Sequence, residues 1–145
     1  MNLRSGATFT RVDSKSNYRR IAGSSIGSNV FVGILRLLNL FSDPTSAIEG
    51  AVNGDDSNIN LSVGDIYGNS NESSLGLPND MIASSFAKVS YMKDAKSEAK
   101  ANDVSRALLT MVSVNTLMLS SMIAKIEKIK YVIWIGNHID MLQYM

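Results

Sequence analysis

The most constraining feature of this sequence is an uncharged stretch of 18 residues, 107–124 (ALLTMVSVNTLMLSSMIA), in a chain of 145. That length reaches the lower limit for a helix that crosses a bilayer. At 100° per residue, however, most of its apolar side chains fall in one arc, and most hydroxyl side chains lie opposite. The pattern therefore predicts an amphipathic helix over residues 103–134 that packs against protein. A membrane span over 107–124 is the alternative.

The apolar arc of this helix is the candidate interaction surface. Asn115 lies inside the arc, where a buried amide would fix the register of packed helices. The alternative is that Asn115 bonds a backbone group or water at the edge of the arc. We expect the helix to pack against partners or copies of itself through seven residues: Leu108, Val112, Asn115, Leu119, Met122, Ile126 and Ile129.

Two further segments have helical patterns. Residues 30–41 (VFVGILRLLNLF) are apolar nearly all round a helix, which predicts a buried or assembly-facing helix too short to cross a bilayer. Apolar residues recur at helical spacing over 82–92, which predicts a second helix, and Asp80 can cap its N-terminus. Residues 131–135 (YVIWI) are β-branched and aromatic, and could form a strand or the last turns of the long helix.

The remaining regions are polar. Ser, Asn, Gly and Asp occupy 23 of the 39 positions in 42–80, which leaves little apolar surface to offset the entropy of ordering. We expect four parts: a disordered N-terminal arm over 1–20, an apolar helical segment over 21–41, a long polar loop over 42–80 and a C-terminal helical region over 81–145. The predicted fold class is mainly α, a helical hairpin or small helix assembly.

The residue types present exclude much catalytic chemistry. With no cysteine, the chain can have no disulfide, thiol nucleophile or cysteine-ligated metal. The single histidine, His138, lies near Asp140 without a positioned nucleophile. Residues 56–60 (DSNIN) open like a calcium loop, but Leu61 and Tyr67 stand where that loop needs Gly and Glu. We therefore expect no enzyme, no catalytic residue, no metal and no cofactor.

Charge is distributed unevenly along the chain. The net charge is +4 over residues 1–46, −6 over 47–80 and +3 over 81–145, which sums to +1. This balance gives no general attraction to nucleic acid, although the blocks could attract one another within or between chains. The first twenty residues contain no apolar stretch of a cleavable secretory signal.

Residues 118–126 (MLSSMIAKI), preceded by Asn102-Asp103 and Ala107-Leu108-Leu109, resemble the C-terminal helix of type III secretion inner-rod proteins. Residues 131–135 depart from that family, whose helix ends in a polar segment with spaced leucines. The resemblance implies a structural subunit of a secretion assembly, self-associating and bound to needle and export-apparatus subunits. It also implies a location outside the cell or at its envelope. A small membrane-anchored protein and a minor virion or capsid component are the alternative functions.

Overall fold

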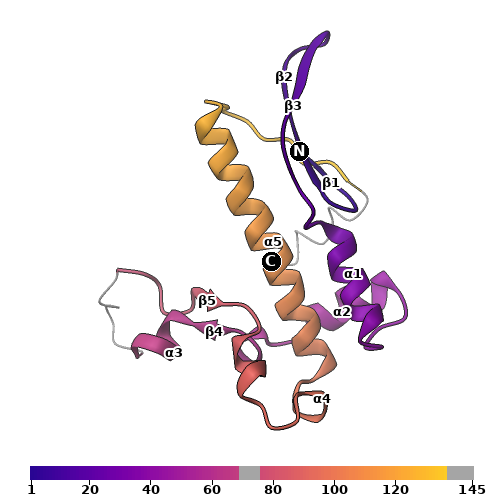
Figure 1. The fold of residues 1–145 in the computed structure, drawn as a ribbon, viewed down its shortest axis with the longest axis vertical. Helices are drawn as coiled ribbons and strands as arrows, with labels where there is room; N and C mark the ends of the chain where they lie inside the picture. Colours follow the sequence, from indigo (N-terminus) through magenta and orange to yellow (C-terminus); the bar gives the residue numbers. More distant parts are fainter. Residues whose placement is uncertain (69–75, 137–145) are drawn as a thin grey trace. The chain divides into compact units, whose positions relative to one another are not determined.

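The structure, a computed structural model, describes residues 1–68 and 76–136 (Figure 1). The chain divides into two compact units: the first comprises Met1–Pro44 and Leu109–Met145, and the second comprises Thr45–Leu108. The long helix α5 (Ala101–Ile126) contributes its first residues to the second unit and the remainder to the first. Two antiparallel sheets accompany the helices, so the fold is α/β and the prediction of a mainly α fold is wrong.

The first unit is built on an antiparallel sheet in the order β1 (Asn2–Leu3), β2 (Ala7–Ser14) and β3 (Asn17–Ser24). The alternation of side chains along β2 accounts for this sheet, because Ala7 and Phe9 are buried on one face and join Leu3 in a core cluster. Ile21 of β3 and Ile123 of α5 pack against that cluster. The structure thus places strands in residues 1–20, where we expected a disordered arm.

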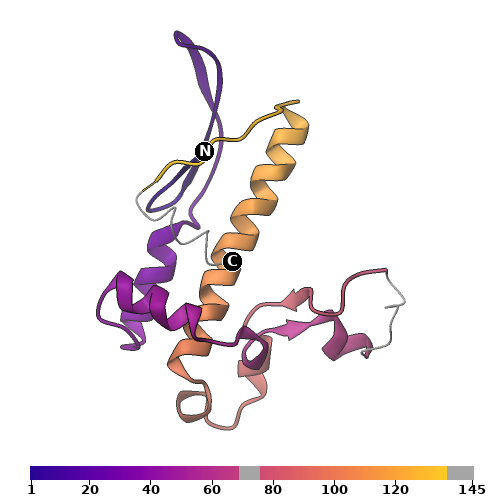
Figure 2. The same ribbon diagram turned by 180° about the vertical axis from the view of Figure 1, so that it is seen from behind.

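The segment after α5 returns to this sheet. Asn2 and Ile135 form a parallel bridge, in which the Leu3 N–H donates to the Ile135 carbonyl at 2.8 Å. Figure 2 shows this segment running back to β1. Helix α5 ends earlier than the expected residue 134, because Lys128 adopts a left-handed conformation with φ of 54°. The Ile129 N–H then bonds the Ala124 carbonyl at 2.8 Å, the hydrogen bond of a Schellman motif.

Helix α1 (Ser28–Leu37) follows β3 and buries Phe31 and Leu35. Both ends of the helix lie earlier in the sequence than those of the predicted 30–41. The helix stops at Leu37 because Asn39 is left-handed (φ 55°) and the Leu40 N–H bonds the Leu35 carbonyl at 3.0 Å. The helix is amphipathic and not buried all round, since Leu37 is 80% exposed.

The second unit consists of short elements. They are α2 (Pro44–Val52), η1 (Asp56–Asn58), β4 (Leu61–Ser62), α3 (Val63–Tyr67), β5 (Ile82–Ser84), η2 (Ala87–Tyr91) and α4 (Ala95–Glu98). The first four lie in 42–80, where we expected a polar loop. Polar side chains hold these elements: Ser62 and Asp65 form a capping box, and the buried Asp103 accepts from the Asp55 N–H at 2.9 Å and from Asn58 Nδ2 at 2.9 Å.

A helix over 82–92 is absent from the described chain, which has β5 and η2 there. Strand β5 pairs with β4, and Phe86 then takes a left-handed conformation with φ of 60°. The Phe86 N–H donates to Oδ1 of the buried Asn60 at 2.9 Å, which fixes this bend. The helical spacing of the apolar residues therefore came from a strand followed by a 3₁₀ turn.

The buried face of α5 differs from the predicted apolar arc. Leu108 and Val112 are buried as expected, but the buried set also includes Ser105, Ser113, Thr116 and Ser120. Backbone carbonyls satisfy two of these hydroxyls: Ser105 Oγ donates to the Ala47 carbonyl at 2.7 Å, and Thr116 Oγ1 donates to the Val112 carbonyl at 2.5 Å. By length and composition alone, α5 is the one helix of the described chain that could cross a membrane, a test that buried core helices also pass.

Candidate anion-binding site

A polar pocket of about 500 Å³ lies in the first unit, where the β1–β2 turn, the end of β3 and the approach to α1 meet. Its charged groups are the guanidinium groups of two arginines, and small or hydroxyl side chains make up most of the rest. The lining residues are Asn2, Arg4, Ser5, Gly6, Ala7, Thr8, Arg20, Gly23, Ser24 and Ser25.

Glycines allow these three segments to approach closely. A Cβ on Gly27 would lie 2.6 Å from the Gly6 Cα and 2.7 Å from the Arg4 carbonyl oxygen. A Cβ on Gly6 would lie 2.5 Å from the Ser24 carbonyl oxygen. The fully buried Ser28 hydroxyl donates to the Arg4 carbonyl at 2.7 Å. The start of α1 is therefore pinned against the β1–β2 turn, backbone to backbone.

Arg20 lies over Gly23 in this pocket, since a Cβ added to Gly23 would overlap the Nη2 atom of Arg20. Neither Arg4 nor Arg20 takes part in an ion pair within residues 1–68 and 76–136. The Oδ1 atom of Asn2 is buried and has no hydrogen-bond partner in the part of the chain that the structure describes. As a hydrogen-bond acceptor, this oxygen cannot bind an anion, so the arginines and hydroxyls are the groups of the pocket that can.

The arrangement suits a phosphate or a carboxylate. Guanidinium groups bind both kinds of anion through paired N–H donors. Two such groups and several hydroxyl side chains line one concave surface, which makes it a candidate anion-binding site.

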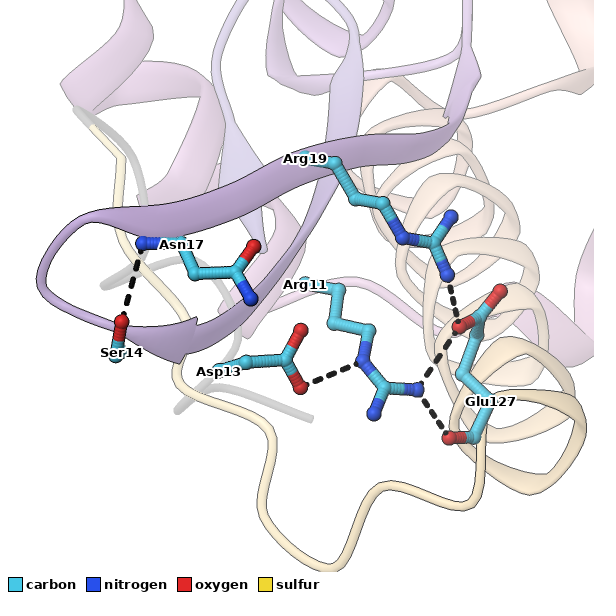
Figure 3. Close-up of polar contacts among 6 residues, drawn as sticks. All are labelled: Arg11, Asp13, Ser14, Asn17, Arg19 and Glu127. Carbon is cyan, nitrogen blue, oxygen red and sulfur yellow. Dashed lines mark hydrogen bonds and ion pairs between the residues drawn. The ribbon is translucent and has the colours of Figure 1, made fainter.

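A network of charges supports the hairpin at the edge of this unit (Figure 3). Oε2 of Glu127 accepts from Arg11 Nη1 at 3.1 Å and from Arg19 Nη2 at 2.9 Å. Arg11 Nε also donates to Asp13 Oδ1 at 2.9 Å. The hydrogen bond that Arg11 donates to Asp13, followed by the one it donates to Glu127, raises the pKa of Arg11 and favours its charged form.

In the second unit, Lys88 Nζ bonds Asp65 Oδ2 at 2.8 Å and the Ser57 carbonyl at 2.8 Å. The hydrogen bond from Lys88, followed by those from Ser62, lowers the pKa of Asp65 from 3.8 to about 2. Hydrogen bonds from Ser57 likewise lower the pKa of Asp55. Both carboxylates hold local backbone, so we assign them to structure.

The structure places the seven residues of the predicted interaction surface in different surroundings. Leu108 and Val112 are buried, and Asn115 Nδ2 donates to the Met111 carbonyl of its own helix at 2.7 Å. Three others are exposed, and their exposed fractions rise along the helix from Leu119 at 38% to Met122 at 52% and Ile126 at 77%. Ile129 is half-buried. His138 and Asp140 lie outside the described residues.

The pocket residues were missed in the sequence. The available signal was an arginine before each of two small-residue segments, Arg4-Ser5-Gly6 and the stretch from Arg20 to Gly27, the second directly preceding a helix. Gly23 and Gly27 lie in the second of these segments. Their actual role is to let backbone and a guanidinium group approach, which only a three-dimensional arrangement reveals.

These features define an α/β protein with a candidate anion-binding pocket. The family model described as Fumble matches residues 1–145, and the chain belongs to the Fumble family. The chain is 33% identical to "Pantothenate kinase 1" of Arabidopsis thaliana over 144 residues, which cover 99% of this chain and 38% of that protein. It is 31% identical to "Pantothenate kinase" of Schizosaccharomyces pombe over 140 residues, 96% of this chain and 35% of that protein. The chain thus spans less than two fifths of these relatives.

Membership of this family overturns the earlier functional predictions. The resemblance to type III secretion inner-rod proteins is wrong, because a match over the whole chain outweighs a short, degenerate pattern in α5. The match therefore also contradicts the predicted secretion subunit and its needle and export-apparatus partners. It gives no support to the membrane-anchored protein or the virion component. The prediction of no enzyme is also wrong for a family whose curated relatives are kinases.

Proposed function

We propose that this chain serves in the phosphorylation of pantothenate, and that the pocket around Arg4 and Arg20 binds an anionic group of one reactant. Curated relatives named as pantothenate kinases support the reaction class. The observation that carries the proposal is the pair of guanidinium groups that line one pocket, both without a carboxylate partner in the described chain.

Phosphoryl transfer depends mainly on positioning and on positive groups placed where negative charge gathers. Two anions would meet such a pocket in this reaction, the phosphates of the nucleotide and the carboxylate of pantothenate. Both present oxygens that a guanidinium fork binds. The proposal therefore names an anionic oxygen ligand, and the two reactants are separate arms of the test.

The test is isothermal titration of the purified chain with magnesium ATP and, separately, with pantothenate. We expect Arg20→Ala to weaken binding of one reactant by about tenfold, the scale of one lost charge-assisted hydrogen bond. The control is Arg36→Ala, which removes an exposed arginine from the last turn of α1. It should leave the affinity unchanged. The arm that responds identifies the anion.

Two outcomes would overturn the proposal. One is a wild-type chain that binds neither reactant. The other is an Arg20→Ala variant that binds both as tightly as wild type. Mass spectrometry for phosphorylated pantothenate, after incubation with both reactants, tests whether the chain performs transfer by itself.

A further inference from the structure

Arg11 and Arg19 face each other across the β2–β3 hairpin, since they are register partners in the sheet. Like charges directly opposite on neighbouring antiparallel strands repel and weaken the pairing. Val12 and Tyr18, the next pair toward the turn, are both 66% exposed, so burial adds little to this end of the hairpin. The register of β3 at Arg19 therefore depends on a negative group near the two arginines.

Within the described chain, Asp13 bonds Arg11 alone, whereas Glu127 is the carboxylate that bonds both arginines. One of its carboxylate oxygens accepts from both guanidinium groups, at 3.1 Å from Arg11 and 2.9 Å from Arg19, as Figure 3 shows. Its side chain is 21% exposed, so solvent screens these bonds less than at an open surface. The Glu127 carbonyl also accepts from Arg11 Nη1 at 2.8 Å. Because Glu127 directly follows the last residue of α5, the end of that helix fixes its position.

Arg20 is the next residue of β3, and consecutive residues of a strand point to opposite faces. Thr10 pairs with Arg20 whereas Phe9 pairs with Ala22, so Ile21 is an extra residue that forms a bulge. Bulges redirect neighbouring side chains. Arg20 thus lies between Arg19, which Glu127 holds, and a bulge, and its direction into the pocket depends on both.

We infer that Glu127 is a positioning residue for the anion-binding pocket. By neutralising the opposed Arg11 and Arg19, it holds β3 in the register that directs Arg20 over Gly23. The effect on ligand binding rests on the proposed function. The position of Arg20 in the unliganded chain does not, and it tests the inference separately.

The first measurement uses the unliganded chain. In NMR spectra of ¹⁵N-labelled protein, Glu127→Gln should shift the Gly23 amide and the Arg20 Nε–Hε signal. The matched control, Glu49→Gln, removes a carboxylate from an exposed residue of α2 in the second unit and should move neither signal. Unchanged Gly23 and Arg20 signals in Glu127→Gln would overturn the inference.

The second measurement titrates inorganic pyrophosphate as the anion probe. We expect Glu127→Gln to weaken its binding by about tenfold, because small displacements of a binding group carry large costs. Adding Arg11→Gln to Glu127→Gln removes the repulsion and should restore affinity to within about twofold of wild type. If Glu127 were merely a stabilising contact, the double variant would bind more weakly still, and that result would refute the inference.

Two further outcomes are decided in advance. If wild type does not bind pyrophosphate, the assignment of the pocket to anions fails, and the NMR signals of the unliganded chain still decide the role of Glu127. If Glu127→Gln does not fold, Glu127→Asp replaces it, with the charge kept but one methylene removed. A folded Glu127→Asp variant should show smaller shifts of the same two signals, and wild-type signals in it would overturn the inference.

Discussion

Gly23 and Gly27 are four residues apart, yet a methyl group at each position would meet a different obstacle. At Gly23 the obstacle is the end of the Arg20 side chain, which can rotate away. At Gly27 it is the backbone of Arg4 and Gly6, which cannot move without opening the β1–β2 turn. One glycine therefore controls where a guanidinium group lies, and the other controls whether the pocket forms.

A pair of substitutions separates these roles. Gly23→Ala should displace Arg20 and weaken anion binding while the free energy of unfolding changes little. Gly27→Ala should lower the free energy of unfolding by about 1–3 kcal/mol, the usual cost of an overpacked site. Urea denaturation and titration with pyrophosphate measure both effects. A Gly23→Ala variant with wild-type affinity would show that Arg20 does not hold the anion from its present position.

The pKa of Asp65 predicts an acid-dependent loss of stability. Because Lys88 lowers this pKa from 3.8 to about 2, the folded state favours the ionised carboxylate. The stabilisation is present above pH 3.8 and is lost as the pH falls through about 2. Between those values, the Tm of wild type should fall more steeply than that of Asp65→Asn. Asp80→Asn serves as the control, and coincident pH profiles of wild type and Asp65→Asn would contradict the prediction.

At the scale of elements, α5 illustrates what periodicity can and cannot predict. The sequence indicated a long helix, because apolar residues recur at its spacing over several turns. It gave no sign of the end at Ile126, since the left-handed position is Lys128 and not the glycine that usually marks it. The burial of Ser105 was equally hidden, because its partner, the Ala47 carbonyl, lies 58 residues away in the sequence.

Substitutions at the two ends of α5 test this description. Leu108 is 1% exposed, so Leu108→Ala should lower the free energy of unfolding by roughly 2–5 kcal/mol. Ile126 is 77% exposed, and Ile126→Ala should change it by less than about 0.5 kcal/mol. Chemical denaturation followed by circular dichroism gives both values. Equal losses would mean that the Ile126 side chain is buried in solution.

The β2–β3 hairpin shows why strands escaped prediction. Only Ala7 and Phe9 are buried along β2, too short an alternation to stand out among serines, threonines and arginines. What holds the rest of the hairpin to its unit is distant in sequence: Glu127 lies 116 residues from Arg11 and 108 from Arg19. No local pattern in residues 1–24 contains that information.

At the scale of the whole molecule, family membership came from similarity spread over all 145 residues, whereas the mistaken resemblance rested on one helix. An amphipathic helix with hydroxyl residues is common to many folds, so its pattern says little about function. The pocket was not predicted from the sequence for a related reason: Arg4 and Arg20 line it together only once β1 and β3 flank the same strand.

The return of the chain to β1 has a consequence for synthesis on the ribosome. The Met1 nitrogen bonds the Ile133 carbonyl, a contact between residues 132 positions apart, and the Asn2–Ile135 bridge lies beside it. Translation runs from the N-terminus, so β1 lacks this neighbour until the residues around Ile135 have been made. The second unit, Thr45–Leu108, is continuous and is made before them. The anion pocket is therefore flanked by a strand that meets one of its partners only after the second unit has been synthesised.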